Sequence, residues 1–226
     1  GGGFGARGAP YPEYTSLLVA AKNIGRPVKW TADRSEAFLT DCQARDHRIR
    51  GEMAVAKDGT FTGLRVRIEW RHGGYLTPRS MLVMVTYLPP TVGGVYGIRH
   101  LELDMLCLLS NTTPQSAYRG VGRVEATYLM ESLVERAAVV TGIDAVQLRY
   151  KNLVTASQFP WKAAGGAVYN SGEFAANLGK ALLCADRDGF ESRRHESAAR
   201  GLLRGFGLAM YIENDGGAPT EFARVV

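Results

Sequence analysis

Two glycine-containing segments carry groups that could bind an anion. The first, GGGFGAR at residues 1–7, precedes a segment with helical spacing. Glycine lets backbone amides approach an anion closely because no Cβ stands in the way, and a following helix adds the positive end of its dipole. The segment matches neither a dinucleotide-binding fingerprint nor a P-loop. Taken alone, it is equally well explained as a plain turn.

The second segment, residues 111–125, reads NTTPQSAYRGVGRVE. Strand-like sequence precedes it and a helical pattern follows, which predicts Arg119 and several backbone amides near a helix N-terminus. Such a place suits a phosphate or an oxo-anion. A purely structural alternative is a capped loop in which Arg119 pairs with Glu125.

Cysteine and histidine show no ligand pattern. Cys42, Cys107 and Cys184 lie far apart with no C-x-x-C pair, which argues against a structural zinc site or a four-cysteine iron–sulfur cluster in this chain. We expect them to be reduced, buried thiols. The histidines are expected to be surface or loop residues rather than ligands: His47, His72, His100 and His195.

Composition indicates an ordinary globular protein. The 226 residues are 46% hydrophobic and 22% charged, enough for one large domain or two small ones. The net charge of +5 is spread along the chain, so a nucleic-acid partner is not expected, while an anionic ligand or acidic partner is compatible with it. No apolar run reaches the ~18 residues of a membrane span.

Hydrophobic spacing predicts the elements that position the two segments. In the first half we expect a helix over residues 13–23, closed by Gly25, and a short strand at 27–30 followed by a charged loop at 33–36. Three long strands are expected over residues 46–56, 61–72 and 98–109. Asp58-Gly59 between the first two long strands is typical of a tight hairpin turn.

The second half is predicted to be mainly helical. Helices are expected over residues 124–141, 144–153, 172–185 and 190–201, with a loop at 158–171 and a strand at 205–212. The mixture predicts an α+β fold. We expect two lobes: residues 1–110, with the glycine loop and antiparallel strands, and residues 111–226, with the Arg119 loop and most helices. Both chain ends look cut, and Val226 looks like the middle of a strand.

The order of these segments resembles the large, molybdopterin-binding subunit of the xanthine dehydrogenase, aldehyde oxidase and carbon monoxide dehydrogenase family. The motifs GGGFGAR, AAKNIGRPVKW, ADRSEAF, KDGTFTGLRVRI, SNTTPQSAYRGVGRVEATYLMESLVERAA, LRYKNLV and GAVYNSG follow the family's order over essentially the whole chain. The Tyr11-Pro12 pair makes it most similar to bacterial carbon monoxide dehydrogenase-like large subunits.

The resemblance implies a molybdenum hydroxylase with a molybdopterin-binding fold. Its cofactor would be Mo-molybdopterin, expected in the cytosine dinucleotide form, and its reaction would hydroxylate substrate carbon with oxygen from water. Electrons would pass to FeS clusters and FAD on a small and a medium partner subunit, in a dimer of heterotrimers. A cytoplasmic location is expected, with the periplasm left open.

The resemblance also implies site residues. The cofactor-binding positions are Gly2, Gly3, Phe4, Gly5, Ala117, Tyr118, Arg119 and Gly120. Phe4, Gly8 and Val121 would border the substrate pocket. The metal would be held through the pterin, with no direct protein ligand. The family's general-base glutamate lies downstream of Val226, so no catalytic residue is assigned here. Glu125 and Glu131 are expected to support the helix, and Glu213 either to support a residue of the site or to be structural.

Three departures from family patterns bear on the substrate. Copper-containing carbon monoxide dehydrogenases have a cysteine where this chain has Gly120, and purine-oxidising members have a glutamate and a phenylalanine at Gly8 and Val121. We therefore expect an aldehyde or an N-heterocycle as substrate. Two alternatives stay open: a carbon monoxide dehydrogenase-type subunit that works without the cysteine, and a non-catalytic cofactor-binding paralogue. We also expect the isolated chain to expose apolar surface and to be poorly stable.

Overall fold

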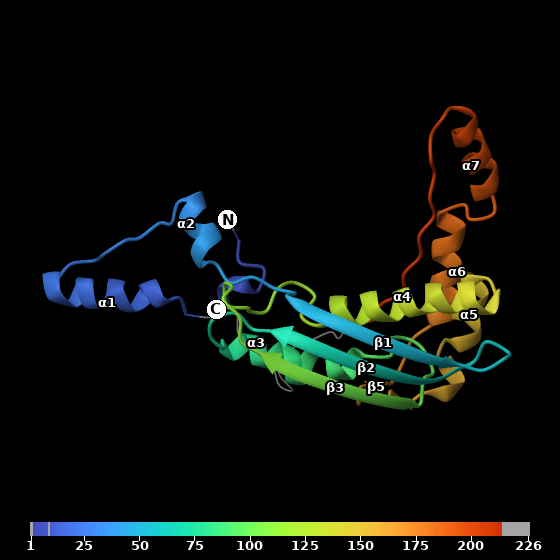
Figure 1. Ribbon diagram of the computed structural model, residues 1–226, viewed down its shortest axis with the longest axis horizontal. Coiled ribbons are helices and arrows are strands. Elements are labelled where there is room, and N and C mark those ends of the chain that lie inside the picture. Colours follow the sequence, from blue (N-terminus) through green and yellow to red (C-terminus); the bar gives the residue numbers. More distant parts are fainter. Residues whose placement is uncertain (1, 9, 214–226) are drawn as a thin grey trace, which may run out of the picture.

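The computed structural model describes residues 2–8 and 10–213. It combines a three-stranded sheet, a two-stranded hairpin and a set of helices, which confirms the predicted α+β class. The sheet and α4 form the central body, while α1 and α2 project from one end and α6 and α7 from the other (Figure 1). The predicted boundary between residues 110 and 111 stays a prediction.

The long hairpin is as predicted, whereas the third strand differs. β1 (His47–Val55) and β2 (Phe61–Arg71) are antiparallel, and Gly59 in their turn has a φ of +88°. β3 (His100–Leu108) pairs with β2 in parallel, so the expectation of antiparallel strands is wrong for this pair. A parallel neighbour requires a long crossover. Residues between β2 and β3 supply it with α3 (Pro78–Leu82), the π-helix η2 (Val83–Tyr87) and the 3-10 turn η3 (Pro89–Thr91).

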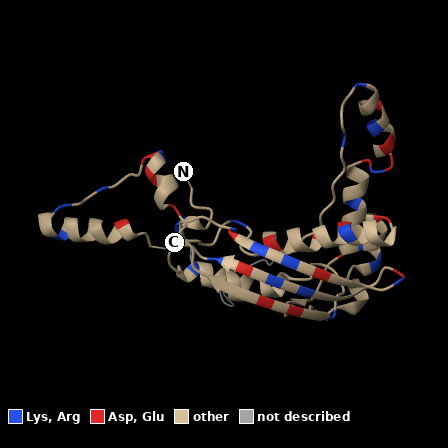
Figure 2. Ribbon diagram, viewed as in Figure 1, with Lys and Arg blue, Asp and Glu red and all other residues tan. Residues whose placement is uncertain are grey.

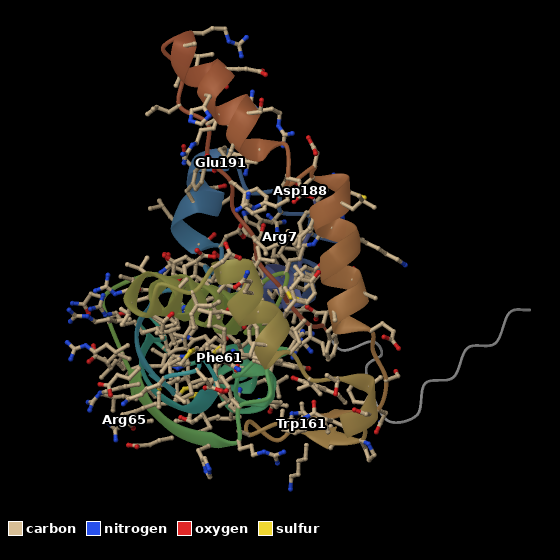
Figure 3. The ribbon with its side chains drawn as sticks, turned by 90° about the vertical axis from the view of Figure 1, so that its right-hand side faces the viewer. Arg7, Phe61, Arg65, Trp161, Asp188 and Glu191 are labelled. Atoms are coloured by element: carbon tan, nitrogen blue, oxygen red, sulfur yellow. The ribbon has the colours of Figure 1, made fainter. Side chains whose placement is uncertain are left out.

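The two faces of the sheet have opposite chemistry. Leu64, Val66 and Ile68 of β2 are buried in the core, whereas the charged residues between them face outward. Acidic and basic residues both occur along the three strands (Figure 2). On the outer face Arg65 pairs with Glu52 and Glu102. Arg65 points away from the side on which core residues such as Phe61 lie (Figure 3). Because apolar and charged residues alternate along β2, its apolar side chains all lie on the face that the helices cover.

The helix α4 (Arg123–Thr141) covers the apolar face. Its residues Leu129, Met130 and Val134 are buried in the same core as β2. A Cβ on Gly51 of β1 would lie 2.5 Å from Leu129 Cδ1, so this glycine permits the close approach of helix and sheet. The helix ends at Gly142 in the left-handed conformation, as the sequence predicts.

The remaining helices of the first 153 residues follow local capping signals. α1 (Pro12–Ile24) ends at Gly25 with a φ of +66°, and α5 (Ala145–Asn152) begins at Asp144, whose carboxylate accepts two backbone N–H groups; both confirm the predictions. The predicted charged loop is wrong, since it forms α2 (Arg34–Thr40) with a capping box between Asp33 and Glu36. Residues 27–30 form no strand.

The C-terminal part is helical with a small hairpin. α6 (Phe174–Cys184) and α7 (Phe190–Ala199) confirm the two predicted helices. The predicted loop at 158–171 contains β4 (Trp161–Lys162) paired with β5 (Val168–Tyr169), after the short turn η4 (Ala156–Gln158). The predicted strand at 205–212 is not formed, because no described strand lies beside it; its apolar residues pack on the core instead. The strand expected at Val226 lies outside the described residues.

A buried ionic network joins the helices to this last segment. Arg149 is fully buried and donates to Glu131 at 2.9 Å, to Glu135 at 2.8 Å and to the Leu208 carbonyl at 3.0 Å. The Tyr96 hydroxyl donates to Glu131 at 2.6 Å, and burial raises the pKa of Tyr96. Glu131 therefore has the structural role expected of it.

Two expectations about single residue types are wrong. Cys107 and Cys184 are exposed and Cys42 is half-buried; the first two lie near the end of β3 and at the end of α6. His72 is fully buried at the end of β2, stacked on Trp70 with ring centroids 6.1 Å apart. Neither of its ring nitrogens has a hydrogen-bond partner among the described residues.

Several helices expose apolar side chains. α1 has no buried residue, Leu18 on it is 72% exposed, and Phe38 on α2 is 77% exposed. Faces of this kind are normally covered by another part of a protein. None of the helices in the described ranges has the length and apolar character needed to cross a membrane.

Replacing Arg149 with leucine should strongly destabilise the fold, because Glu131 is left buried without its cation. We expect the free energy of unfolding of the full-length protein to fall by about 3–5 kcal/mol. Urea denaturation of the wild type, Arg149→Leu and the exposed control Arg48→Leu measures this. A loss no larger than that of the control would contradict the role of the network.

The burial of His72 should make stability depend on pH. Burial lowers the pKa of His72, so the folded state binds fewer protons than the unfolded state, whose histidine pKa is about 6.5. Stability should therefore fall as the pH drops through 6.5. In urea titrations between neutral and mildly acidic pH, His72→Leu should show a shallower decline than the wild type, with His195→Leu as the control for loss of an imidazole. Equal slopes in wild type and His72→Leu would refute the assignment.

Candidate functional site

The two glycine-containing segments meet in the folded chain. The Arg119 amide donates a hydrogen bond of 2.9 Å to the Phe4 carbonyl. A Cβ on Gly5 would lie 3.0 Å from the Ala117 carbonyl oxygen, so the backbones pack directly against each other. The residues predicted from separate motifs therefore belong to a single site.

The first segment folds as consecutive tight turns. The Gly3 and Gly5 carbonyls accept from Ala6 at 3.0 Å and from Gly8 at 3.2 Å, forming the 3-10 turn η1 (Ala6–Gly8). Phe4 has a φ of +49° and a largely exposed ring that lies over Gly2. No described residue accepts a hydrogen bond from the Phe4 or Gly5 amide.

Side-chain hydrogen bonds to Asp41 connect this segment to the end of α2. Asp41, which follows α2, accepts from the Tyr11 hydroxyl at 3.0 Å and pairs with Arg7 at 3.2 Å. Burial and the bond to Asp41 raise the pKa of Tyr11 to about 12. Tyr11 therefore stays protonated at neutral pH and keeps donating to Asp41.

The second segment forms a tight turn that leads into α4. The Val121 amide donates 2.8 Å to the Tyr118 carbonyl, and Gly120 and Gly122 have φ values of +90° and +84°. A Cβ on Gly122 would lie 2.9 Å from the Leu88 nitrogen, so only glycine fits at the cap of the helix. Val121 itself is held at a φ of +34°, an uncommon conformation for a β-branched residue.

Gln115 anchors this turn to the sheet and was not predicted. Its side chain accepts from the Trp70 indole at 2.8 Å and donates to the Asp46 carbonyl at 3.1 Å. The backbone amide of Gln115 donates to the His72 carbonyl at 3.0 Å, and its backbone carbonyl accepts from the Thr77 hydroxyl at 2.7 Å. A lone glutamine in a polar loop carries no signal for such a role, because its partners come from distant segments.

Arg45 is the second residue that the sequence did not reveal. Its guanidinium donates to the Arg119 carbonyl, lies 5.3 Å from the Tyr118 ring centroid and pairs with Glu125 at 3.7 Å. The structural alternative, in which Arg119 pairs with Glu125, is therefore wrong. The Arg119 side chain is exposed and makes no ion pair within the described residues.

Backbone strain concentrates where these segments meet. Four described non-glycine residues have positive φ, and three of them, Phe4, Arg45 and Val121, belong to this site. Such conformations cost on the order of 1–3 kcal/mol each and persist where the surrounding structure enforces them, often at ligand sites. The clustering points to a binding role for the joined segments.

An open groove of about 1040 Å³ lies beside the turn. Tyr118, Arg119 and Gly120 line it together with the exposed face of α4 and residues 209–213. Arg123 pairs with Glu213 at 2.9 Å across its edge, which gives Glu213 a structural partner.

The three positions predicted to border a substrate pocket differ in their surroundings. Phe4 is exposed at the meeting of the two segments. Gly8 lies at the end of the first turn, where its carbonyl accepts from Arg79 at 3.0 Å. Val121 packs partly against the core and does not line the groove. Their role toward substrate stays a prediction.

The exposed groups of the site are hydrogen-bond donors. Free backbone amides and the Arg119 guanidinium suit a ligand rich in anionic oxygen, such as a phosphate or an oxo-metal group. Among residues 2–8 and 10–213, no cluster of three or more His, Cys, Asp or Glu could hold a metal ion. The donor set fits a phosphate-bearing molybdopterin.

Comparison with known proteins agrees with this chemistry. The family model described as molybdopterin cofactor-binding domain matches residues 1–153. The carbon monoxide dehydrogenase large chain of Hydrogenophaga pseudoflava is 34% identical over 100% of this chain and 29% of its own length. The nicotine 6-hydroxylase large subunit of Paenarthrobacter nicotinovorans is 30% identical over 96% of this chain and 26% of its own length.

Solved structures give the same result. Quinoline 2-oxidoreductase from Pseudomonas putida 86 matches with a TM-score of 0.83 and 30% identity over 89% of this chain and 26% of its own. Carbon monoxide dehydrogenase from Oligotropha carboxidovorans matches with a TM-score of 0.78 and 29% identity, over 89% of this chain and 25% of its own. The chain thus spans between a quarter and a third of these relatives' length. The predicted resemblance is confirmed: this chain belongs to the molybdopterin cofactor-binding domain of the xanthine dehydrogenase, aldehyde oxidase and carbon monoxide dehydrogenase family of large subunits.

Proposed function

We propose that this chain forms one wall of the cofactor site in a molybdenum hydroxylase large subunit. The whole protein would be a molybdopterin-dependent oxidoreductase that hydroxylates an N-heterocycle or an aldehyde with oxygen from water. The observation that carries the proposal is the joining of the Phe4 and Arg119 segments, with their unused donors, at one strained site.

In the proposed site each group has a defined task. The Phe4, Gly5 and Gly120 amides and the Arg119 guanidinium donate hydrogen bonds to anionic oxygens of the cofactor. Gly5 packs against Ala117 and keeps the two backbones together. Gly2 and Gly3 leave room for the cofactor beside the backbone, and the Phe4 ring shields the contact from water. When bound, the molybdopterin supplies the two-electron oxidation of the substrate. Fixed donors of this kind stabilise negative charge that develops on oxygen without having to reorganise.

The substrate class is supported by the relatives and by Gly120. Nicotine 6-hydroxylase and quinoline 2-oxidoreductase are named for N-heterocycles. Gly120 stands where copper-containing carbon monoxide dehydrogenases have the cysteine that binds copper. With its φ of +90° and a Cβ position only 2.3 Å from Val124 Cγ2, a side chain at this position would be strained and crowded. An N-heterocycle is therefore the preferred substrate, and carbon monoxide the alternative.

The cofactor form, the partners and the compartment belong to the proposal as well. We propose the cytosine dinucleotide form of molybdopterin, FeS and FAD partner subunits in a dimer of heterotrimers, and a cytoplasmic location. Relatives named as a large subunit and as subunit gamma of a complex support a multi-subunit assembly. A non-catalytic paralogue remains the other candidate, and a metal-loaded protein without substrate-dependent dye reduction would favour it.

Replacing Arg119 with alanine should weaken cofactor binding, because a charged, planar donor is lost from the site. We expect molybdenum near one atom per full-length wild-type subunit and a severalfold lower content in Arg119→Ala, measured by elemental and pterin analysis of the complex purified with its partners. Arg50→Ala, which removes an exposed cation from β1, is the matched control. Molybdenum-free wild-type protein from cells that load related enzymes would refute the proposal.

The substrate class can be read from dye reduction by the intact complex. N-heterocycles such as quinoline or nicotine should drive reduction of an artificial electron acceptor, whereas carbon monoxide should not, because the copper-binding cysteine is replaced by Gly120. Reduction by carbon monoxide alone would favour the alternative. Adding an aldehyde series separates the two substrate classes left open.

A further inference from the structure

The peptide that joins Arg119 to Gly120 decides where one donor points. It is the central peptide of the turn closed by the Val121 amide and the Tyr118 carbonyl. Turns of types I and II differ mainly in the orientation of this peptide, and type II requires a positive φ at its third residue. Gly120 holds that place with a φ of +90°, while Arg119 is not among the residues with positive φ. The turn is therefore type II.

Arg45 holds this peptide from one side. Its guanidinium donates to the Arg119 carbonyl and lies against the Tyr118 ring. In a planar trans peptide the C=O and N–H bonds point in opposite directions. The Gly120 N–H consequently points away from Arg45. Gly120 lines the groove beside the turn, and no described residue accepts a hydrogen bond from its amide.

The position of Arg45 is itself enforced by the fold. Its φ is +67°, which a non-glycine residue adopts only under constraint. Gln43, two residues earlier, is bound to the second segment: its backbone amide donates to the Pro114 carbonyl at 3.1 Å, and its carbonyl accepts from the Ser116 amide at 2.9 Å. Glu125 of α4, 6% exposed, lies 3.7 Å from the guanidinium and is its ion-pair partner. The backbone before β1 and the second segment thus aim the Arg45 side chain at the Arg119 carbonyl.

We propose that Arg45 is a positioning residue that keeps the Gly120 amide turned into the groove, where it donates to an anionic oxygen of the cofactor. The inference rests on the proposed function, since it needs molybdopterin as the acceptor. Without Arg45 the central peptide is free to rotate toward the type I orientation. Its carbonyl oxygen would then face the groove and repel the same anion.

A simpler role for Arg45 would be to neutralise the buried Glu125. The two roles can be distinguished with variants that remove the Glu125 charge and the Arg45 hydrogen bond to the Arg119 carbonyl independently. Glu125→Gln removes the carboxylate but leaves Arg45 on the Arg119 carbonyl. The double variant Arg45→Gln/Glu125→Gln removes the guanidinium without leaving a buried unpaired charge. Arg45→Lys keeps the charge and one donor, and Arg48→Gln, an exposed cation of β1, is the control.

The experiment measures how fast molybdenum leaves the full-length subunit, purified with its partners and kept in metal-free buffer. We expect Glu125→Gln and Arg48→Gln to lose molybdenum at the wild-type rate. Substitutions in the layer behind metal-site groups lower affinity by about 10–100-fold, so the double variant should lose it about tenfold faster. Arg45→Lys should lie between. The Mo(V) EPR spectrum of the metal that remains should shift in the double variant and be unchanged in Glu125→Gln.

Three results would overturn the inference in different ways. If the double variant lost molybdenum no faster than the wild type, Arg45 would not act on the cofactor, while the proposed function would stand. If Glu125→Gln and the double variant both lost molybdenum faster than the wild type and at equal rates, the role of Arg45 would be only to neutralise Glu125. A wild type without molybdenum would remove the proposed function itself. Thermal unfolding of the metal-free variants accompanies the measurement, and Arg45→Lys carries the test if the double variant does not fold.

Discussion

The hydrogen bond from the Arg119 amide to the Phe4 carbonyl is the constraint on which the site depends. It brings a loop at the start of the chain against the loop that opens α4, and neither loop has a core of its own. For the bond to form, the backbones must touch, so Gly5 faces Ala117 where any side chain would be crowded. The sheet and α4 serve as the rigid support that makes this contact reproducible.

The support is built from polar contacts beneath the turn as well as from apolar packing. Gln115 forms hydrogen bonds with groups from β2, from the residue before β1 and from the cap of α3, and Arg45 reaches the turn from the segment before β1. Buried hydrogen bonds of this kind specify a geometry more sharply than apolar contacts do. The strained backbones of Phe4, Arg45 and Val121 are held by this surrounding frame.

The distribution of exposed apolar residues fits a chain that is one part of a larger architecture. α1 buries no residue and α2 exposes Phe38 and Leu39. The outer face of the sheet, in contrast, carries charged side chains that pair with one another. The relatives that share this fold are more than three times as long. The groove beside Arg119 is likewise open, and it is the place where we propose that the cofactor binds.

Local signals in the sequence determined much of this protein. The Asp58-Gly59 turn, Gly25, Gly142 and Asp144 act within a few residues, so the hairpin and helix ends followed from them. The two segments proposed to bind an anion are recognisable because their glycines and Arg119 lie within short motifs. What only the tertiary structure decided depends on distant partners: the parallel pairing of β3, the burial of His72, and the choice of Arg45 as the partner of Glu125. Pairing energies between distant residues depend on geometry that no local pattern encodes, and so Gln115 and Arg45 became visible only in the folded chain.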